Sequence, residues 1–554
     1  MKYFTIRKQF LFPSFTIDAE EQKKLDRYLQ FLDDSNVGRI LFFTKQRNLY
    51  GGRPSYNRYD MFATMLYGFA FGSGTLRDLE TYCKYDLRYI YLMQYETPSY
   101  VAFCDFFNTY IVPNSEKIFA AISSAVIKTC NIELNDAFID GTKIEANANK
   151  YKFVWKPTTF HIRLCDKIRN LLVMNDLGRG IPNTDIFSSK IIASKVTEFS
   201  ELSKKCDPAQ KKALEKQYSQ LVSYLEKAIE YEEKEAICGD NRNSYYKTDH
   251  DATAMTLKTD YYSGLGSNMH AAYNVQSVVV SGIVCAYYVS QSRADINDFI
   301  PTIEMFYRCQ GCYPKNICAD SGYGSLKNYS YLHEKNIGNY VKHQSWEGNV
   351  TGKNPDRYRL EENGTITCLA GNTGVEVQLR NRHPKNSQSV FFKIEGCYSC
   401  PFNVYCKRWQ KIKDEDYKIF EVNKELCTYK QEAEENLLSP KGIEIRVNRS
   451  AQVEGSFGNL KQNMHYSRFR RRSLKKVSAE FMFTFLGYDI RKLFRYFEGK
   501  LKISYWKAPD NLTAEKFKKP SAKRLANKVR KKQAKNKNQE AKKYKYKKTA
   551  KASD

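Results

Sequence analysis

Three carboxylates lie in segments whose strand and helix patterns could bring them together at one site. Asp140 lies in DAFIDGTKIEANA and Asp320 in NICAD, and both segments have the apolar pattern of β-strands. Glu454 lies in AQVEGSFGNLKQNMH, where apolar residues recur at helical spacing. We expect Asp140 and Asp320 to end their strands and to meet at one sheet edge, because ligands gather beyond the carboxyl ends of strands in open sheets.

Carboxylates that converge in this way suit hard divalent cations. Mg²⁺ and Mn²⁺ prefer oxygen ligands, and two such ions about 4 Å apart can promote both attack and departure at a phosphodiester. Lys461 lies two helical turns after Glu454, so it can hold a phosphate nearby. Strand-end Asp and helical Glu are usually structural or solvated, so only their joint placement indicates a site. Spacing leaves three alternatives open: Asp136, Asp249 and Asp251.

Periodicity predicts the elements that must position these acids. Residues 18–130 have helical periodicity, which predicts a helical domain over 1–130, either a helix-turn-helix or a plain bundle. From residue 131 to 344 the order β-β-β-α-β-α-β predicts a mixed sheet flanked by helices, to which the helices of 411–500 return. A charged helical stretch within about 152–247 predicts an inserted helical hairpin.

Cysteines form a second candidate site. Four of the 15 share the pattern C-x28-C-x2-C-x5-C: Cys368, Cys397, Cys400 and Cys406. A Cys-x2-Cys turn brings two thiolates together, and two more complete the tetrahedral set of a structural Zn²⁺. We therefore predict a small cysteine ribbon at 345–410 that binds zinc, with unligated buried cysteines as the alternative. Cys309 and Cys312 repeat the pair spacing but lack a second pair.

The charge of the chain points to a polyanionic partner. The 89 Lys+Arg exceed the 61 Asp+Glu by 28, and nucleic acid is the commonest partner of such an excess. Residues 511–554 contain 17 Lys+Arg and 3 Asp+Glu. We expect 501–554 to be a disordered tail that binds nucleic acid without sequence preference, or one that only aids solubility. The sequence has neither a long apolar run nor a secretory-signal pattern, so we expect a cytoplasmic protein with no membrane partner.

Several segments, in order, resemble one family. They are GGRPSYNRYDMFATMLYGFAFGSGTLRDLE, IDGTKIEANANKY, TDHDATAM with AAYNVQ, PKNICADSGYGSLKN, and RSAQVEGSFGNLKQNMHYSRFRRRSLKKVSAEF. Over roughly residues 1–500 they resemble the insertion-sequence transposases of the DDE type: a helical domain, the first-Asp strand, the second strand, the ADxGY motif and the VExxFGxxK helix. CYSCP takes the place of a cysteine-containing insertion found in some members. The resemblance implies a mixed α+β fold with a ribonuclease-H-like core.

The resemblance also implies an activity: metal-dependent cleavage of DNA at the ends of an insertion sequence and strand transfer into target DNA. It implies that Asp140, Asp320 and Glu454 bind Mg²⁺ or Mn²⁺, expected as two ions, and that Lys461 assists on the DNA. A homodimer is expected to hold double-stranded DNA, both terminal inverted repeats and target, in the nucleoid of a prokaryotic cytoplasm. Expected DNA contacts are Arg449, Arg470, Arg471, Arg472, Lys475 and Lys476.

Two other functions remain open at this point. One is a catalytically inactive, transposase-derived DNA-binding protein. The other is a hydrolytic nuclease of the same fold that does not join strands. The chain runs uninterrupted through all three acidic motifs, which argues against decay.

Overall fold

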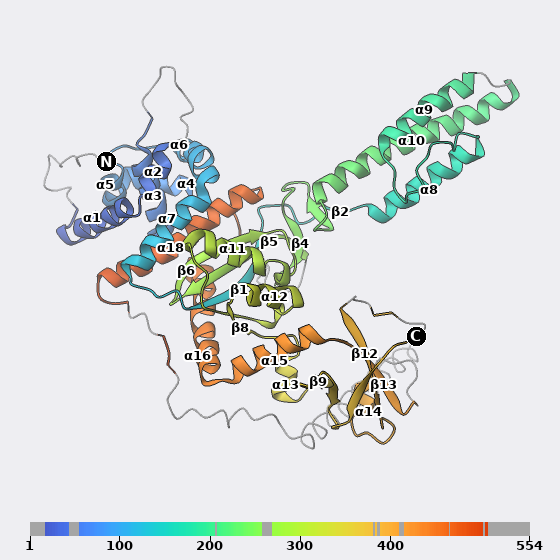
Figure 1. Ribbon diagram of the computed structural model, residues 1–554. Coiled ribbons are helices and arrows are strands. Elements are labelled where there is room, and N and C mark those ends of the chain that lie inside the picture. The colour runs from blue at the N-terminus through green and yellow to red at the C-terminus, as the bar shows by residue number, and fades with distance from the viewer. Residues whose placement is uncertain are drawn as a thin grey trace, which may run out of the picture.

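The computed structural model describes residues 17–43, 55–204, 208–257, 269–379, 383–384, 388–408, 415–464, 466–501 and 505–507. Its N-terminal part is helical, as predicted (Figure 1). The helices are α1 (Ala19–Asp34), α2 (Val37–Phe43), α3 (Arg58–Phe71), α4 (Leu76–Tyr85), α5 (Leu87–Leu92), α6 (Tyr100–Phe106) and α7 (Ser115–Thr129). Side-chain caps begin several of them, as where Asn57 accepts from the backbone N–H groups of Tyr59 and Asp60.

A mixed sheet of six strands forms the centre. Its strands are β1 (Asp136–Glu145), β4 (Thr253–Thr256), β5 (Met269–Val280), β6 (Ile283–Ser290), β7 (Asn316–Ala319) and β8 (Gly338–Val341). The order is β4-β5-β1-β7-β8, and β6 pairs with β5. The pairs β1–β5 and β5–β6 are antiparallel, whereas β1–β7 and β7–β8 are parallel. Helix α11 (Phe299–Gln310) precedes β7, and α12 (Leu326–Glu334) connects β7 to β8. The predicted element order is confirmed except for β4, an additional strand of the sheet that the prediction lacked.

The prediction that the first strand ends at Asp140 is wrong. β1 continues to Glu145, because the residues after Asp140 keep pairing with β5: Gly141 faces Gln276 and Thr142 faces Val275. Asp140 therefore lies in the middle of a strand. Asp320 directly follows β7, as predicted.

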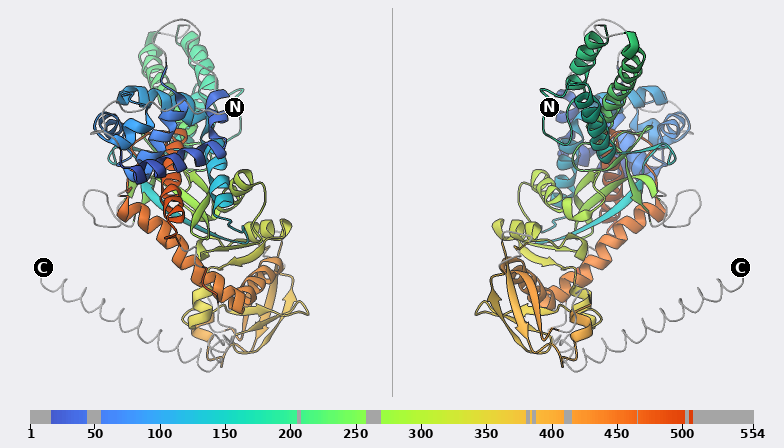
Figure 2. Two further views of the ribbon diagram at one scale, coloured as in Figure 1. Left: turned by 90° about the vertical axis from the view of Figure 1, so that its left-hand side faces the viewer. Right: turned by 90° about the vertical axis from the view of Figure 1, so that its right-hand side faces the viewer.

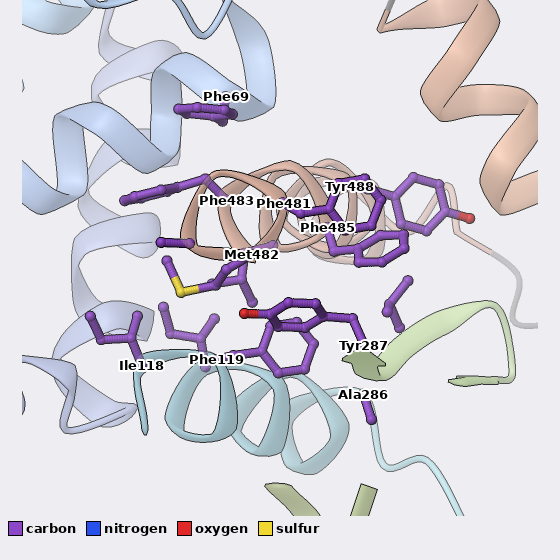
Figure 3. Packing of buried hydrophobic residues seen from close by; sticks show 14 of the residues in the cluster. Phe69, Ile118, Phe119, Ala286, Tyr287, Phe481, Met482, Phe483, Phe485 and Tyr488 are labelled. Atoms are coloured by element: carbon purple, nitrogen blue, oxygen red, sulfur yellow. The ribbon is translucent and has the colours of Figure 1, made fainter. Parts of the chain in front are cut away.

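One long helix joins the N-terminal helices to the sheet. α18 (Leu474–Phe497) lies between them, and it is buried along most of its length (Figure 3). Phe483 of α18 stacks on Phe69 of α3 with ring centroids 5.1 Å apart, and Phe485 contacts Tyr287 of β6. The backbone of Phe69 lies 2.8 Å from the point where a Cβ at Gly487 would be, so the two helices need a glycine there. The helices and the sheet thus share one continuous core.

A helical arm projects from the sheet (Figures 1 and 2). It has three helices rather than the predicted hairpin: α8 (Thr158–Met174), α9 (Ser189–Lys204) and α10 (Pro208–Cys238). These helices pack around a core of their own, which includes Leu164, Phe199 and Leu221. A two-stranded ribbon of β2 (Phe153–Trp155) and β3 (Ser244–Tyr246) joins the arm to the sheet.

A second sheet lies on the far side of the central sheet from the N-terminal helices (Figure 1). Its order is β13-β12-β11-β10-β9, preceded by α13 (Trp346–Thr351). The strands are β9 (Tyr358–Leu360), β10 (Ile366–Cys368), β11 (Thr373–Val377), β12 (Ser389–Glu395) and β13 (Tyr417–Asn423). The cysteine unit therefore extends beyond the predicted boundary at 410, because β13 pairs with β12 along its whole length.

Three helical segments return the chain to the central sheet. They are α15 (Lys424–Leu438), α16 (Pro440–Arg449) and an irregular helix formed by the π-helical turn Ser450–Glu454, α17 (Gly455–Gly458) and the π-helical turn Asn459–Asn463. Val453, Phe457 and Leu460 are buried, as the predicted apolar stripe requires. Among the described residues, none of the helices has the length and apolarity to cross a membrane.

Candidate active site

Asp140 and Asp320 lie at the same level on neighbouring strands. In the parallel pair β1–β7, Asp136 faces Asn316 and Phe138 faces Cys318. Continued two residues further along each chain, this register places Asp320 opposite Asp140. Paired strands lie about 5 Å apart, and the charge of Asp320 does act on Asp140, since it raises the pKa of that carboxyl.

The surroundings of Asp140 concentrate negative charge. Burial raises the pKa of Asp140, and the carboxylates of Asp320 and Asp295 raise it further. Arg449 opposes this, since its Nη2 lies 3.2 Å from Asp140 Oδ1. Asp320 is more open and lies 3.7 Å from Lys342 Nζ. The site thus holds three acids and two basic side chains.

A buried amide organises the neighbouring acid. Gln276 of β5 donates to Asp295 Oδ1 at 3.0 Å and accepts from the Tyr323 hydroxyl. Its amide fits beside Asp140 because Gly141 has no side chain: a Cβ there would lie 2.4 Å from Gln276 Nε2. Asp295 is therefore fixed near the two predicted aspartates.

Asp298 extends this polar network into the core. Its Oδ2 accepts from Ser290 at 2.6 Å and from Asn274 at 2.9 Å. Burial raises the pKa of Asp298 to about 7, and Asp295 raises it as well. A carboxyl group that is partly protonated near neutral pH thus lies behind the site.

The helix that carries the third acid packs along the same strand. The π-helical turn that ends at Glu454 contacts β1 and β5, and Gln452 in this turn accepts from the backbone N–H of Gly282. The side chain of Glu454 lies outside the described part of the structure. Lys461 reaches β1, where its Nζ donates to Thr142 Oγ1 at 2.6 Å. Thr142 is two residues beyond Asp140 and shares its face of the strand.

The three alternative acids have structural partners. Asp136 binds Lys441, Tyr505 and Asn316. Asp249 accepts from the Tyr273 hydroxyl and from the Ser473 backbone N–H, and Asp251 accepts from the Leu474 N–H at the start of α18. These hydrogen bonds use the carboxylates to hold elements together.

The predicted DNA-contact residues have different surroundings. Arg449 is 9% exposed and faces Asp140. Arg471 is partly buried: its guanidinium lies 3.8 Å from the centre of the Phe107 ring and 3.7 Å from Glu480. The other four predicted contacts are exposed: Arg470, Arg472, Lys475 and Lys476. Together with Arg471 they form a basic cluster.

The basic cluster lies beside the far end of β1. Arg472 Nε donates to the carbonyl of Asn147, two residues after β1, and Asn147 Nδ2 donates to the carbonyl of Arg470. Glu480, which is fully buried, accepts from the backbone N–H groups of Arg470 and Arg471. The cluster is therefore fixed to the strand that carries Asp140.

The four cysteines line one small cavity between β10, β12 and the Cys397–Cys400 turn. The Phe402 backbone N–H donates to Cys400 Sγ at 3.4 Å. Lys407 and Lys418 line the same cavity. Cys309 is buried in α11 and Cys312 is exposed. Among the described side chains, no three His, Cys, Asp or Glu residues lie close enough together to hold a metal ion as they stand.

Comparison with protein families adds independent information. The family described as Transposase DDE domain matches residues 367–494, and the family described as Transposase domain (DUF772) matches residues 16–109. Both families are described as transposase domains, and the match over 367–494 is to a DDE domain. The DDE match includes Glu454, Lys461 and the four cysteines, but it does not reach Asp140 or Asp320. No curated protein and no solved structure matches the chain.

Sequence reasoning missed Asp295 and Gln276. Asp295 lies in a single 3-10 turn after a loop, where no periodicity distinguishes it. Gln276 and Asn274 did leave a signal, because two amides interrupt the apolar strand AAYNVQSVVV. Buried amides in a strand need partners, and here the partners are the two missed acids, Asp295 and Asp298.

Proposed function

We propose that the protein is an active DNA transposase that cleaves phosphodiesters at the ends of an insertion sequence and joins the freed 3′ ends to target DNA. The observation that carries this proposal is the β1–β7 pairing, whose register, continued by two residues, puts Asp320 opposite Asp140. The helix that bears Glu454 packs against the same strand. The strand order, with β6, β5 and β1 antiparallel and then β7 and β8 parallel, supports a ribonuclease-H-like core.

The carboxylates fit divalent metal ions. Asp140 and Asp320 offer hard oxygen donors, and the pKa of Asp140 is raised partly by its acidic neighbours, a repulsion that a cation would relieve. We propose that Asp140, Asp320 and Glu454 hold Mg²⁺ or Mn²⁺, expected as two ions. When bound, the ions would polarise the scissile phosphate and favour deprotonation of the attacking hydroxyl.

Other side chains hold the DNA in this proposal. Lys461 carries its ammonium group to Thr142, close to Asp140, where it would bind a non-bridging phosphate oxygen. The exposed Arg470 and Arg472 continue the positive charge past the end of β1. The double-stranded DNA would therefore run from the site across this basic cluster. Joining two terminal repeats requires two active sites, so we propose a homodimer.

We also propose that Cys368, Cys397, Cys400 and Cys406 bind a structural Zn²⁺. The four thiols line one cavity, and the Phe402 N–H already points at the sulfur of Cys400, as a thiolate ligand requires. Lys407 and Lys418 would offset the net negative charge of a zinc ion with four thiolates. The sulfurs must move closer together on binding.

Strand cleavage and joining test the proposed function. The protein is incubated with Mg²⁺ and a DNA that carries the terminal repeats of its own element, beside Asp320→Ala and Glu454→Gln. We expect the native chain to cut at the repeat ends and to produce joined strands, and both variants to bind the DNA but not to cut it. Equal inertness of all three proteins would indicate the DNA-binding alternative. Cleavage without joined products would indicate the hydrolytic nuclease.

A further inference from the structure

α16 packs against β7, and two ion pairs connect it to the neighbouring strand β1. Near its start, Lys441 Nζ lies 2.8 Å from Asp136 Oδ2; at its end, Arg449 Nη2 lies 3.2 Å from Asp140 Oδ1. Eight helical residues span about 12 Å and four strand residues span about 13 Å, so the two ion pairs match in spacing. α16 is thereby held in one register with the strand that carries Asp140.

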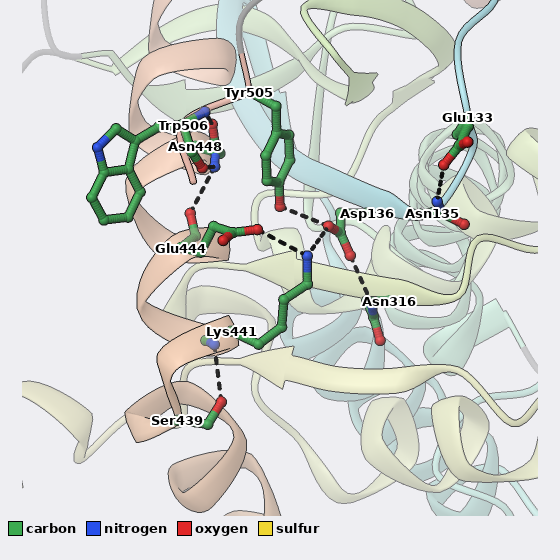
Figure 4. A network of polar contacts seen from close by, with 11 residues as sticks. Glu133, Asn135, Asp136, Asn316, Ser439, Lys441, Glu444, Asn448, Tyr505 and Trp506 are labelled. Atoms are coloured by element: carbon green, nitrogen blue, oxygen red, sulfur yellow. Dashed lines mark hydrogen bonds and ion pairs between the residues drawn. The ribbon is translucent and has the colours of Figure 1, made fainter. Parts of the chain in front are cut away.

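A short segment near the C-terminus, residues 505–507, contacts the first ion pair directly and α16 one residue before the second (Figure 4). The Tyr505 hydroxyl donates to Asp136 Oδ2 at 2.6 Å, beside Lys441. One residue on, the Trp506 backbone N–H donates to Asn448 Oδ1, and Asn448 Nδ2 donates to the Trp506 carbonyl, both at 2.8 Å. Asn448 is 2% exposed and directly precedes Arg449.

The segment is held by hydrogen bonds to buried polar groups rather than by apolar packing alone. Asp136 is 8% exposed and is fully engaged, since Asn316 of β7 donates to its other oxygen at 2.7 Å. Burial works to raise the pKa of Asp136, but the hydrogen bonds from Lys441, Tyr505 and Asn316 outweigh it and lower the pKa. A buried carboxylate that is charged and shared by β7, α16 and the C-terminal segment fixes all three relative to β1.

We propose that residues 505–507 act as a clamp that positions the active site. The clamp holds α16 in register with β1, and α16 in turn orients Arg449 on Asp140 and begins the helix that carries Glu454. Tyr505 and Asn448 are positioning residues: they act through α16 and touch neither DNA nor reacting atoms. The catalytic part of this inference rests on the proposed function, whereas the structural part does not.

Two full-length variants test the clamp. Tyr505→Phe removes one hydroxyl and keeps the ring beside Lys441, and Asn448→Ala removes both bonds to Trp506. We expect each to lower kcat for strand cleavage about tenfold at saturating DNA, with KM and DNA affinity changed by less than about twofold. Tyr85→Phe, at a tyrosine that is 80% exposed, is the matched control and should change neither quantity.

Hydrogen exchange provides a measurement that does not need activity. In both variants, the backbone amides of 440–454 should exchange at least about fivefold faster than in the native chain, while those of α3 keep their rates. Unchanged exchange in 440–454, or a loss of DNA affinity equal to the loss of kcat, would overturn the clamp. If the native chain does not cut DNA, the proposed function fails and the exchange result alone decides the clamp.

Discussion

Gly141 leaves space beside Asp140 for the side-chain amide of Gln276. The missing side chain leaves room for Gln276, which holds Asp295 and Tyr323 beside Asp140. Without that amide, Asp295 would lose a hydrogen-bond donor in a partly buried site. The absence of a side chain at Gly141 therefore allows Gln276 to hold the negatively charged Asp295 next to the candidate active site.

Gly141→Ala tests this arrangement. We expect the free energy of unfolding to fall by about 1–3 kcal/mol, because the added methyl group overlaps the Gln276 amide, and we expect cleavage to fall with it. Urea unfolding followed by circular dichroism measures the change. Gly455→Ala is the control for stability, since nothing lies within 4 Å of a Cβ there. Equal stability of the two variants would contradict the close contact at Gly141.

Asp298 predicts a pH dependence of stability. Its pKa in the folded protein, about 7, is above that of an unfolded Asp, about 3.9. Between these values the folded state holds the extra proton, so the free energy of unfolding should fall as pH rises from 4 to 7 and then level off. Asp298→Asn replaces the carboxyl group with an amide that does not titrate, so the free energy of unfolding should change less between pH 4 and pH 7. Chemical unfolding at pH 5, 6, 7 and 8 gives the comparison; parallel profiles for the two proteins would refute the raised pKa.

The elements were predictable where periodicity is strong. The helices over 18–130, the order of strands and helices in the core, and the apolar stripe of Val453, Phe457 and Leu460 all followed from spacing. The end of β1 was not predictable from local sequence. A glycine such as Gly141 is typical of a strand end, and the pairing with β5 that extends the strand is a long-range contact. The third arm helix was missed although Gly178, Gly180 and Pro182 mark the break between α8 and α9.

The candidate site was predictable only in part. Asp140 and Asp320 were selected because both were expected to end strands, which holds for Asp320 but not for Asp140. Nothing local reveals that β1 and β7 are neighbours in the sheet. The buried role of Arg449 was equally hidden, since a basic residue in a basic protein suggests DNA contact. Tertiary pairing, not composition, separates Asp140 from Asp136 four residues before it.

The small sheet is predicted to depend on metal. Cys400→Ser removes one thiolate, so the variant should contain substoichiometric zinc and lose order in residues 345–423. Zinc is measured by elemental analysis of protein purified without added metal. Cys312→Ser is the control, because Cys312 is exposed and does not line the cavity of the four cysteines. Equal zinc contents in the native chain and Cys400→Ser would exclude this ligand set.

In the whole molecule, the candidate active site and the lysine-rich residues 511–554 belong to different parts of the chain. N-terminal helices, central sheet and α18 share one core, while the arm and the cysteine-bearing sheet extend from it in different directions (Figure 2). The predicted boundary of the disordered tail at 501 is wrong, because Tyr505 and Trp506 are hydrogen-bonded to β1 and α16. The lysine-rich residues 511–554 lie outside the described part of the structure.

Removal of 511–554 tests the contribution of the tail. The 17 Lys+Arg of this segment should release counterions from any DNA, so the truncated chain should bind all sequences more weakly and show a smaller dependence of log affinity on log salt. Fluorescence anisotropy with terminal-repeat and unrelated DNA at several salt concentrations measures both effects. A loss restricted to the terminal repeats would instead assign sequence recognition to the tail.

The central claim is that Asp140, Asp320 and Glu454 form one metal centre. Crystals of the protein with terminal-repeat DNA, grown with Mn²⁺ and measured at the manganese edge, test it most directly. We predict anomalous peaks within about 2.5 Å of carboxylate oxygens of Asp140 and Asp320, with Glu454 completing the coordination. Peaks bound by other residues, or none at these aspartates in a complex that cuts its DNA, would contradict the account.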